Sequence, residues 1–151
     1  MSEQIERVLH DGNELAIILR AGYHNDGIQF FTAPEYSQQL AYMNRPAGHV
    51  IDPHVHNEVR REVVHTLEAL FVRSGKVKLS LYDSGCEFVD SRVLEAGDIV
   101  LLTSGGHGIE MLEPSEIVEV KQGPYAGDQD KTRFDPSAQA HATGRGTGTP
   151  A

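Results

Sequence analysis

The sequence predicts an all-β fold of the sandwich or barrel type, for three reasons. Apolar residues recur at every second position in several short stretches, turn-forming residues separate these stretches at regular intervals, and no long helical periodicity runs through them. From about Glu14 to Gln122 this pattern gives roughly nine or ten strands. Many short strands at such spacing are typical of all-β domains, and we expect a jelly roll.

The clearest strand is 76–82, where Val77, Leu79 and Leu81 should share one face while Tyr82 and the polar residues take the other. The segments 67–72 and 98–102 are apolar on both faces and should form central strands.

Further alternating stretches predict strands at 14–20, 27–32 and 39–44. Asp83-Ser84-Gly85 should turn strand 76–82 into a hairpin, and further turns are expected at 96–98 and 113–115. One short helix is expected near Glu3–Leu9.

The length of 151 residues fits one domain, which we place at 1–136 with its core at about 14–122. Residues 123–134 should form an extended arm against the domain. From Ser137 onward no large apolar residue occurs, so 137–151 are expected to form a disordered tail.

Charge and composition narrow the function classes. Against 13 Lys and Arg stand 22 Asp and Glu, a net charge of −9, which argues against a nucleic-acid binder or docking on an anionic membrane. No apolar run is long enough to span a bilayer, and the polar N-terminus lacks the features of a secretory signal. With the lone Cys86, which forms no internal disulfide, this predicts a cytoplasmic protein.

Four residues suggest a metal site. His54 and His56, two positions apart, would point to the same face of a strand. Glu68 stands inside an apolar run, where a carboxylate is costly unless it is paired with an arginine or bound to a cation. His107 should point inward beside Ile109, as a core histidine or as a further ligand. Together, three imidazoles and a carboxylate suit one divalent transition metal such as Fe, Mn, Ni, Co or Zn, with open positions left for a ligand.

At these residues the chain resembles the cupin family. Gly48, five residues, His54-x-His56, then Glu68, six residues and Gly75 follow the first cupin motif, and Gly97 with His107 loosely follow the second. The resemblance implies a single-domain jelly-roll β-barrel, a metal held by three histidines and a glutamate inside it, and a homodimer. The segment SGGHGIEML and those after it also look like small cupins of bacterial sugar and polysaccharide pathways.

The chain departs from the family pattern in several places. Eleven residues separate His56 from Glu68, where three or four are usual, and His107 comes one position early. Thr103 replaces a proline and Met111 an asparagine. The insertion 57–67 is a candidate lid.

Residues other than the four metal candidates could contact a substrate. Arg60 and Arg61, within the insertion, could bind a carboxylate or phosphate, or could pair with Glu58 and Glu62 on a solvated hairpin. Tyr42 and Gln122 could also face the pocket. His49, His65 and Cys86 receive no ligand or catalytic role.

The preferred function is a metal-dependent enzyme acting on a small polar, sugar-like substrate. Isomerisation or epimerisation is the first choice and oxygenation the second, with Glu68 as a candidate catalytic group.

Two alternatives stay open. The first is a cupin that binds a small ligand without turnover. The second is a metal-free nucleotide-sugar epimerase that uses His54 with Asp52 or Tyr42 as acid and base. The paired histidines and Glu68 argue against the second alternative.

Overall fold

The computed structural model describes residues 4–136, and within them the fold is built from three antiparallel sheets. The large sheet has the order β1-β2-β8-β5-β10, the small sheet β7-β6-β9, and β3 and β4 form a two-stranded hairpin. The strands are β1 (Ile5–His10), β2 (Asn13–Leu19), β3 (Gly27–Phe30), β4 (Ala41–Asn44), β5 (Glu68–Ser74), β6 (Lys76–Tyr82), β7 (Phe88–Glu95), β8 (Ile99–Leu102), β9 (Gly106–Met111) and β10 (Glu116–Lys121). A 3-10 turn, η1 (Gly127–Gln129), follows them.

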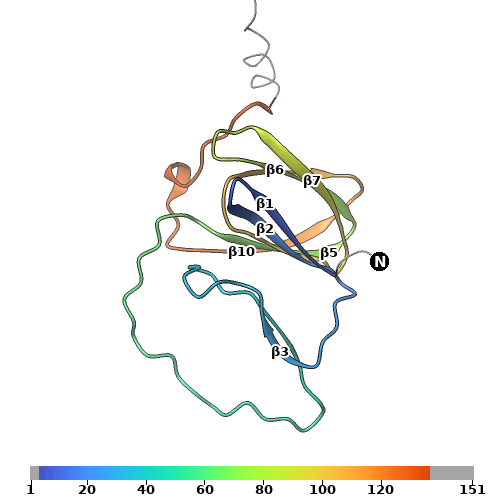
Figure 1. Ribbon diagram of the computed structural model, residues 1–151, viewed down its shortest axis with the longest axis vertical. Coiled ribbons are helices and arrows are strands. Elements are labelled where there is room, and N and C mark those ends of the chain that lie inside the picture. The colour runs from blue at the N-terminus through green and yellow to red at the C-terminus, as the bar shows by residue number, and fades with distance from the viewer. Residues whose placement is uncertain (1–3, 137–151) are drawn as a thin grey trace, which may run out of the picture.

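The large and small sheets stack face to face (Figure 1). Alternate residues of β6 point inward, and Val77, Leu79 and Leu81 are at most 1 % exposed. They belong to the same core as Ile18 and Val100 of the large sheet. This inner core confirms the alternation predicted for 76–82.

A second core covers the opposite face of the large sheet. Ile17 and Leu101 are fully buried there, and Phe31 is 4 % exposed. Tyr23 and Tyr42 pack against this outer core, and their rings meet edge to face at 4.9 Å. Because the large sheet is buried on both faces, its central strands carry apolar residues at consecutive positions, as predicted for 67–72 and 98–102.

The helix expected near Glu3–Leu9 is wrong, because Ile5–His10, the described part of this segment from residue 5 onward, is strand β1. Ile5 pairs with Leu19 and Val8 pairs with Ala16. Residues three apart point to opposite faces of a strand, and both faces of the large sheet are apolar here. The same spacing that resembles one face of a helix therefore also suits a strand.

Tyr82, expected on the polar face of 76–82, is more deeply buried than Lys76, Lys78 and Ser80 of that face. The register shifts between Leu81 and Tyr82, and the Tyr82 side chain is buried, with 8 % of its surface exposed. Its ring meets Phe88 and Phe134 edge to face, at 6.0 and 5.0 Å between ring centroids. Phe134 is distant in sequence, so local alternation could not predict this burial.

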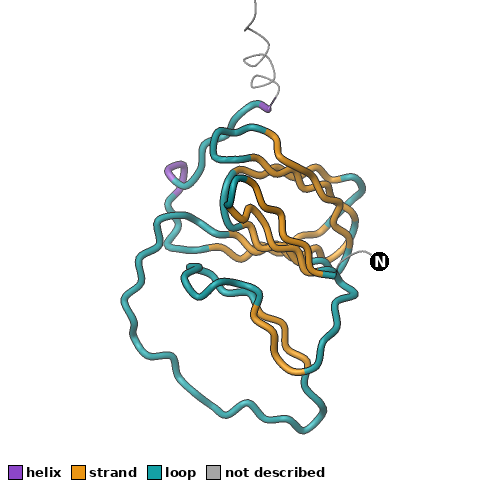
Figure 2. Tube along the Cα trace, in the orientation of Figure 1, coloured by secondary structure: helices purple, strands orange, loops and turns teal. Residues whose placement is uncertain are grey.

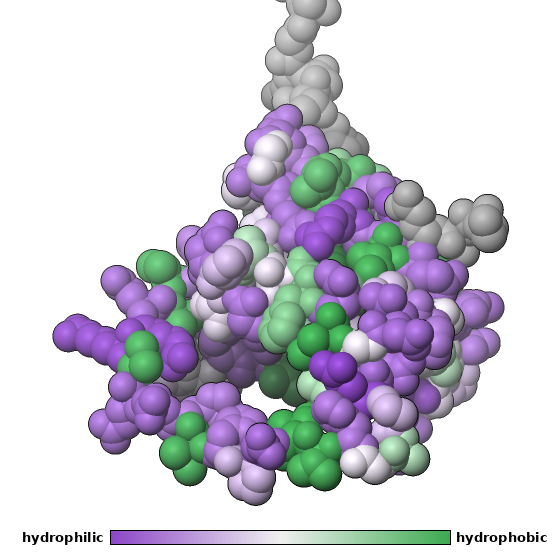
Figure 3. All heavy atoms as spheres, turned by 60° about the horizontal axis from the view of Figure 1, so that its bottom comes forward, coloured by the Kyte–Doolittle hydropathy of each residue, from purple (hydrophilic) through white to green (hydrophobic). Residues whose placement is uncertain are grey.

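Residues 45–67 form a long connection between β4 and β5 that contains neither helix nor strand and loops away from the sheets (Figures 1 and 2). Large aliphatic side chains are exposed along it: Val50 72 %, Ile51 55 %, Val55 85 %, Val59 60 %, Val63 44 % and Val64 82 %. In Figure 3 apolar residues alternate with polar ones over this part of the surface.

Among the described residues the two sheets stack on each other, but no strand pairing joins them into a closed barrel. β9 pairs with β6 along one edge and, within residues 4–136, with no strand along the other. The predicted tail, 137–151, lies outside the described residues. No helix within 4–136 is long and apolar enough to cross a membrane.

A buried carboxylate ties the turn before β8 to β1 and β2. Asp98 is 5 % exposed and accepts hydrogen bonds from Arg20 Nη1 at 2.8 Å and from the amides of Ala21 and Glu95, each at 2.9 Å. Arg20 also contacts Glu6 at 2.6 Å. Removing the carboxylate would take the acceptor away from the amides of Ala21 and Glu95 and one of the two carboxylate partners away from Arg20.

We therefore expect Asp98→Ala to lower the free energy of unfolding by about 3 kcal/mol, measured by urea denaturation. The matched control is Glu110→Ala, whose carboxylate meets Lys78 at 3.3 Å with both side chains more than 40 % exposed. The control should lose less than about 1 kcal/mol. Equal losses in the two variants would contradict a special role for Asp98.

Candidate functional site

Glu68 and His107 meet between the two stacked sheets. Glu68 is the first residue of β5 and shares the inward face of that strand with Leu70. His107 is on β9, where it pairs with the buried Leu81 of the neighbouring strand β6. His107 Nε2 is 3.1 Å from Glu68 Oε2. The Glu68 side chain is 14 % exposed and that of His107 34 % exposed. Two residues almost forty positions apart in the sequence thus form one acid–base pair.

Lys121 places a positive charge near the Glu68 carboxylate, on the side of the oxygen that does not contact His107. It lies opposite Glu68 in the β5–β10 register, with its Nζ 4.0 Å from Glu68 Oε1. The hydrogen bond from His107 lowers the pKa of Glu68 below its usual value, and the charges of His107, Lys121 and Lys131 act in the same direction, while burial opposes them. Glu68 is therefore ionised at neutral pH.

The pair lines a cavity of about 1040 Å³. Its apolar wall includes Leu15, Leu102 and Ile109, and polar groups come from His65, Thr66 and the residues before β9. A cavity with an apolar wall and a few convergent polar groups is the usual form of a small-molecule site.

The C-terminal arm completes one side of this cavity. Phe134 packs on Tyr82, and a Cβ at position 106 would lie 3.2 Å from the Phe134 ring, so glycine at this position leaves room for the ring. Asp130 accepts a hydrogen bond from Thr66 at 2.5 Å. The arm therefore lies against the domain at these two points, as expected for residues 123–134.

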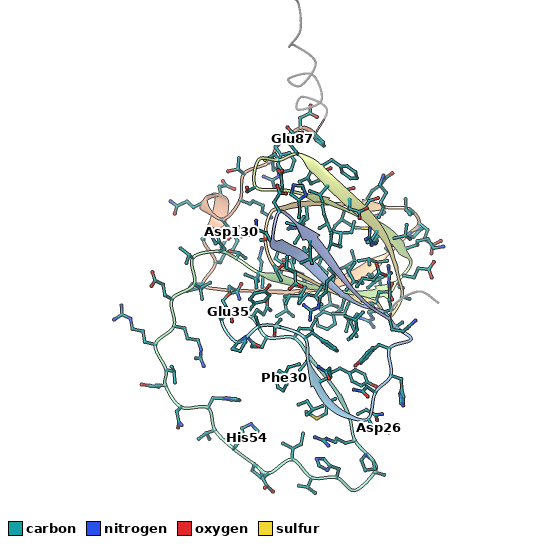
Figure 4. The ribbon with its side chains drawn as sticks, viewed as in Figure 1. Asp26, Phe30, Glu35, His54, Glu87 and Asp130 are labelled. Carbon is teal, nitrogen blue, oxygen red and sulfur yellow. The ribbon has the colours of Figure 1, made fainter. Side chains whose placement is uncertain are left out.

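His54 and His56 lie elsewhere, on the long 45–67 connection. Both are exposed, with ring centroids 5.3 Å apart, and His54 Nδ1 is 2.8 Å from the carbonyl oxygen of Asp52. Figure 4 shows His54 on the outlying part of this segment, away from the sheets. Neither residue lines the cavity of Glu68 and His107.

The predicted four-residue metal set is therefore not assembled in this conformation. Among residues 4–136 no three or more His, Cys, Asp or Glu side chains are grouped so that they could hold a metal ion. Glu68 and His107 supply two donors in mutual contact, and the other two predicted donors remain on the outlying segment.

The four candidate substrate contacts also lie outside the cavity lining. Arg60 and Arg61 are exposed on the 45–67 segment, and neither forms an ion pair with the described residues around it. Tyr42 packs in the outer core. Gln122 accepts a hydrogen bond from the amide of Leu67 at 2.5 Å, which holds the start of β5 against the end of β10.

No family model matches the chain, and neither a curated protein nor a solved structure matches it.

The Glu68–His107 contact predicts a specific dependence of stability on pH. Because folding lowers the pKa of Glu68 from 4.5, its stabilising effect is fully present above this value and is lost as the pH falls through the folded-state pKa. Glu68→Gln should therefore be less stable than the wild type by about 1 kcal/mol near pH 6, and the difference should shrink as the pH falls below 4.5 through the lowered pKa of Glu68. Urea unfolding across this range measures it.

Glu110→Gln is the control for this titration, because it removes an exposed carboxylate from the outward side of the same strand as His107. Its stability difference from the wild type should be small at every pH. A Glu68→Gln variant as stable as the wild type at pH 6 would contradict the lowered pKa of Glu68.

Proposed function

We propose that this chain is a cupin-type protein that binds a small polar molecule in the cavity at Glu68 and His107 and transforms it with the help of one divalent transition metal. The observation that carries the proposal is the 3.1 Å contact between Glu68 and His107 on the wall of a cavity large enough for a small molecule. Isomerisation or epimerisation of a sugar-like substrate is the preferred reaction, and oxygenation comes second.

The metal requires a rearrangement of the 45–67 segment. One carboxylate oxygen and one imidazole nitrogen are suitable donors for Fe, Mn, Ni, Co or Zn, but two donors are too few for a tight site. His54 and His56 would supply the missing donors if the segment folded against the sheets. The residues do not fit a metal in the present conformation, so we derive no reaction step through it.

The edge of the small sheet supports such a rearrangement. Ile109 and Met111 are 37 % and 55 % exposed, although their cross-strand partners Leu79 and Val77 are buried. The inner face of the small sheet is therefore uncovered at β9, and the edge of β9 lacks a partner within residues 4–136. A strand formed by the segment around His54 would cover this face, use the free edge and bring the jelly roll closer to a closed barrel.

The chain's own residues can act on a proton. Glu68 accepts a hydrogen bond from His107 and orients its ring, so that the other ring nitrogen can hold or remove a proton of a bound molecule. Removing a proton next to a carbonyl group is the step that sugar isomerisation and epimerisation share.

The same contact supports a second candidate, in which the Glu68–His107 pair acts as acid and base without a metal. This version moves the metal-free epimerase from His54, which contacts the backbone of Asp52, to a pair that lines the cavity. A binding module without turnover would use the same cavity.

Metal binding distinguishes these functions. We expect the purified, untagged protein to take up about one equivalent of Co²⁺, Ni²⁺, Mn²⁺, Fe²⁺ or Zn²⁺, measured by elemental analysis and, for Co²⁺, by visible absorption. Glu68→Gln, His107→Ala and the double variant His54→Ala/His56→Ala should each weaken binding at least about tenfold, because each removes one or two of four donors.

The control is His24→Ala, which removes an exposed histidine from outside the cavity. It should bind as the wild type does. Hydrogen exchange adds a second measurement, since amides 49–57 should become protected when the metal binds. No uptake of any of the five metals would overturn the metal-dependent function and leave the metal-free pair. Uptake unaffected by His54→Ala/His56→Ala would overturn the rearrangement.

A further inference from the structure

The C-terminal arm is fixed at two points beside the cavity. At one point Asp130 accepts a hydrogen bond from Thr66 at 2.5 Å and lies 3.9 Å from Lys121 Nζ. At the other, Phe134 packs edge to face on Tyr82, 5.0 Å between ring centroids. The three residues between these anchors, Lys131-Thr132-Arg133, are exposed and line the cavity.

Two of these three residues, Lys131 and Arg133, carry a positive charge. Within residues 4–136, Lys131 and Arg133 take part in no ion pair or hydrogen bond. Both side chains lie on the lining of the cavity that also includes Glu68 and His107.

The acidic residues that line the same cavity are, in contrast, already paired. Glu68 contacts His107, and Glu119 and Asp130 both contact Lys121. On the opposite side, Asp11 and Asp83 lie 3.3 and 3.6 Å from His10, and Asp83 also accepts the amides of the turn after β6. Among the described cations of the lining, Lys131 and Arg133 are therefore the two that no carboxylate holds in an ion pair.

We propose that Lys131 and Arg133 form a subsite for the anionic group, a carboxylate or a phosphate, of the molecule that the Glu68–His107 pair receives. The proposal deepens the proposed function and rests on its cavity. The Arg133 guanidinium can bind two oxygens of such a group side by side, and Lys131 adds a compact positive charge. The Thr132 hydroxyl and backbone amide are further donors at the same place.

This subsite narrows the substrate class to small organic anions. A molecule held by its anionic end at 131–133 would extend into the cavity towards Glu68 and His107, along the apolar wall of Leu15 and Leu102. Because Phe134 and Asp130 fix the arm, little additional ordering is required when the anion binds. The arm then determines which molecules reach the reactive pair.

The test is a titration of the full chain with inorganic phosphate and with malonate, followed by amide chemical shifts in NMR spectra at constant ionic strength. Both probes should shift the amides of 131–134 in a saturable way. In Lys131→Gln/Arg133→Gln the dissociation constant should rise at least about tenfold, because two charge-assisted contacts are lost. Tighter binding of phosphate identifies a phosphorylated substrate, and tighter binding of malonate a carboxylate.

The matched control is Arg45→Gln/Arg73→Gln, which removes the same charge from exposed positions outside the cavity lining. Its dissociation constants should equal those of the wild type. Shifts that sodium chloride reproduces, or that persist in Lys131→Gln/Arg133→Gln, would overturn the anion subsite. Since metal uptake is measured separately, loss of metal binding with an intact anion response would overturn only the metal chemistry, and the reverse result only the subsite.

Discussion

The site depends on one constraint, the packing of two apolar sheet faces against each other. Leu79 and Leu81 of the small sheet and Val100 of the large sheet are completely buried, so neither sheet can shift by one residue without exposing its whole inner row. This fixes two registers, Glu68 opposite Leu102 and His107 opposite Leu81. The Glu68–His107 contact is a consequence of these registers and needs no separate driving force.

The 45–67 segment and the small sheet both leave apolar surface exposed to water. The segment exposes six large aliphatic side chains, while the inner face of the small sheet stays uncovered at Ile109 and Met111. Burying a fully exposed valine or isoleucine gains about 1.5–3 kcal/mol, and ordering each residue of backbone costs about 1–2 kcal/mol. The two terms are similar in size, so metal ligands at His54 and His56 could decide the balance.

The C-terminal arm, residues 123–134, shapes the cavity through contacts that are distant in the sequence. Its position depends on a few contacts with residues far away in the sequence, chiefly Phe134 with Tyr82 and Asp130 with Thr66. These contacts hold an otherwise polar segment in place and present its cations to the cavity. A segment that contributes little to the core can in this way define what the cavity binds, while the sheets supply the reactive pair.

Local pattern was sufficient to predict much of the fold. Period-two alternation identified β6, apolar runs identified the central strands β5 and β8, and turn residues located the hairpin that contains Cys86. The same local view was wrong for Glu3–Leu9, because a spacing of three residues suits a helix face and also a strand buried on both sides. It also could not predict the burial of Tyr82, because Phe134, which packs on its ring, lies about fifty positions away.

For the candidate site, the sequence by itself determined that Glu68 needs a partner, since a carboxylate inside an apolar run cannot stay unpaired at low cost. Only the tertiary structure decided that this partner is His107, that His54 and His56 lie on an outlying segment, and that Lys131 and Arg133 line the cavity. The physical reason is that the hydrophobic pattern of a segment and the cost of a carboxylate within it depend on residues that are neighbours in the chain. Contact between strands and arms depends on register and packing over long sequence distances.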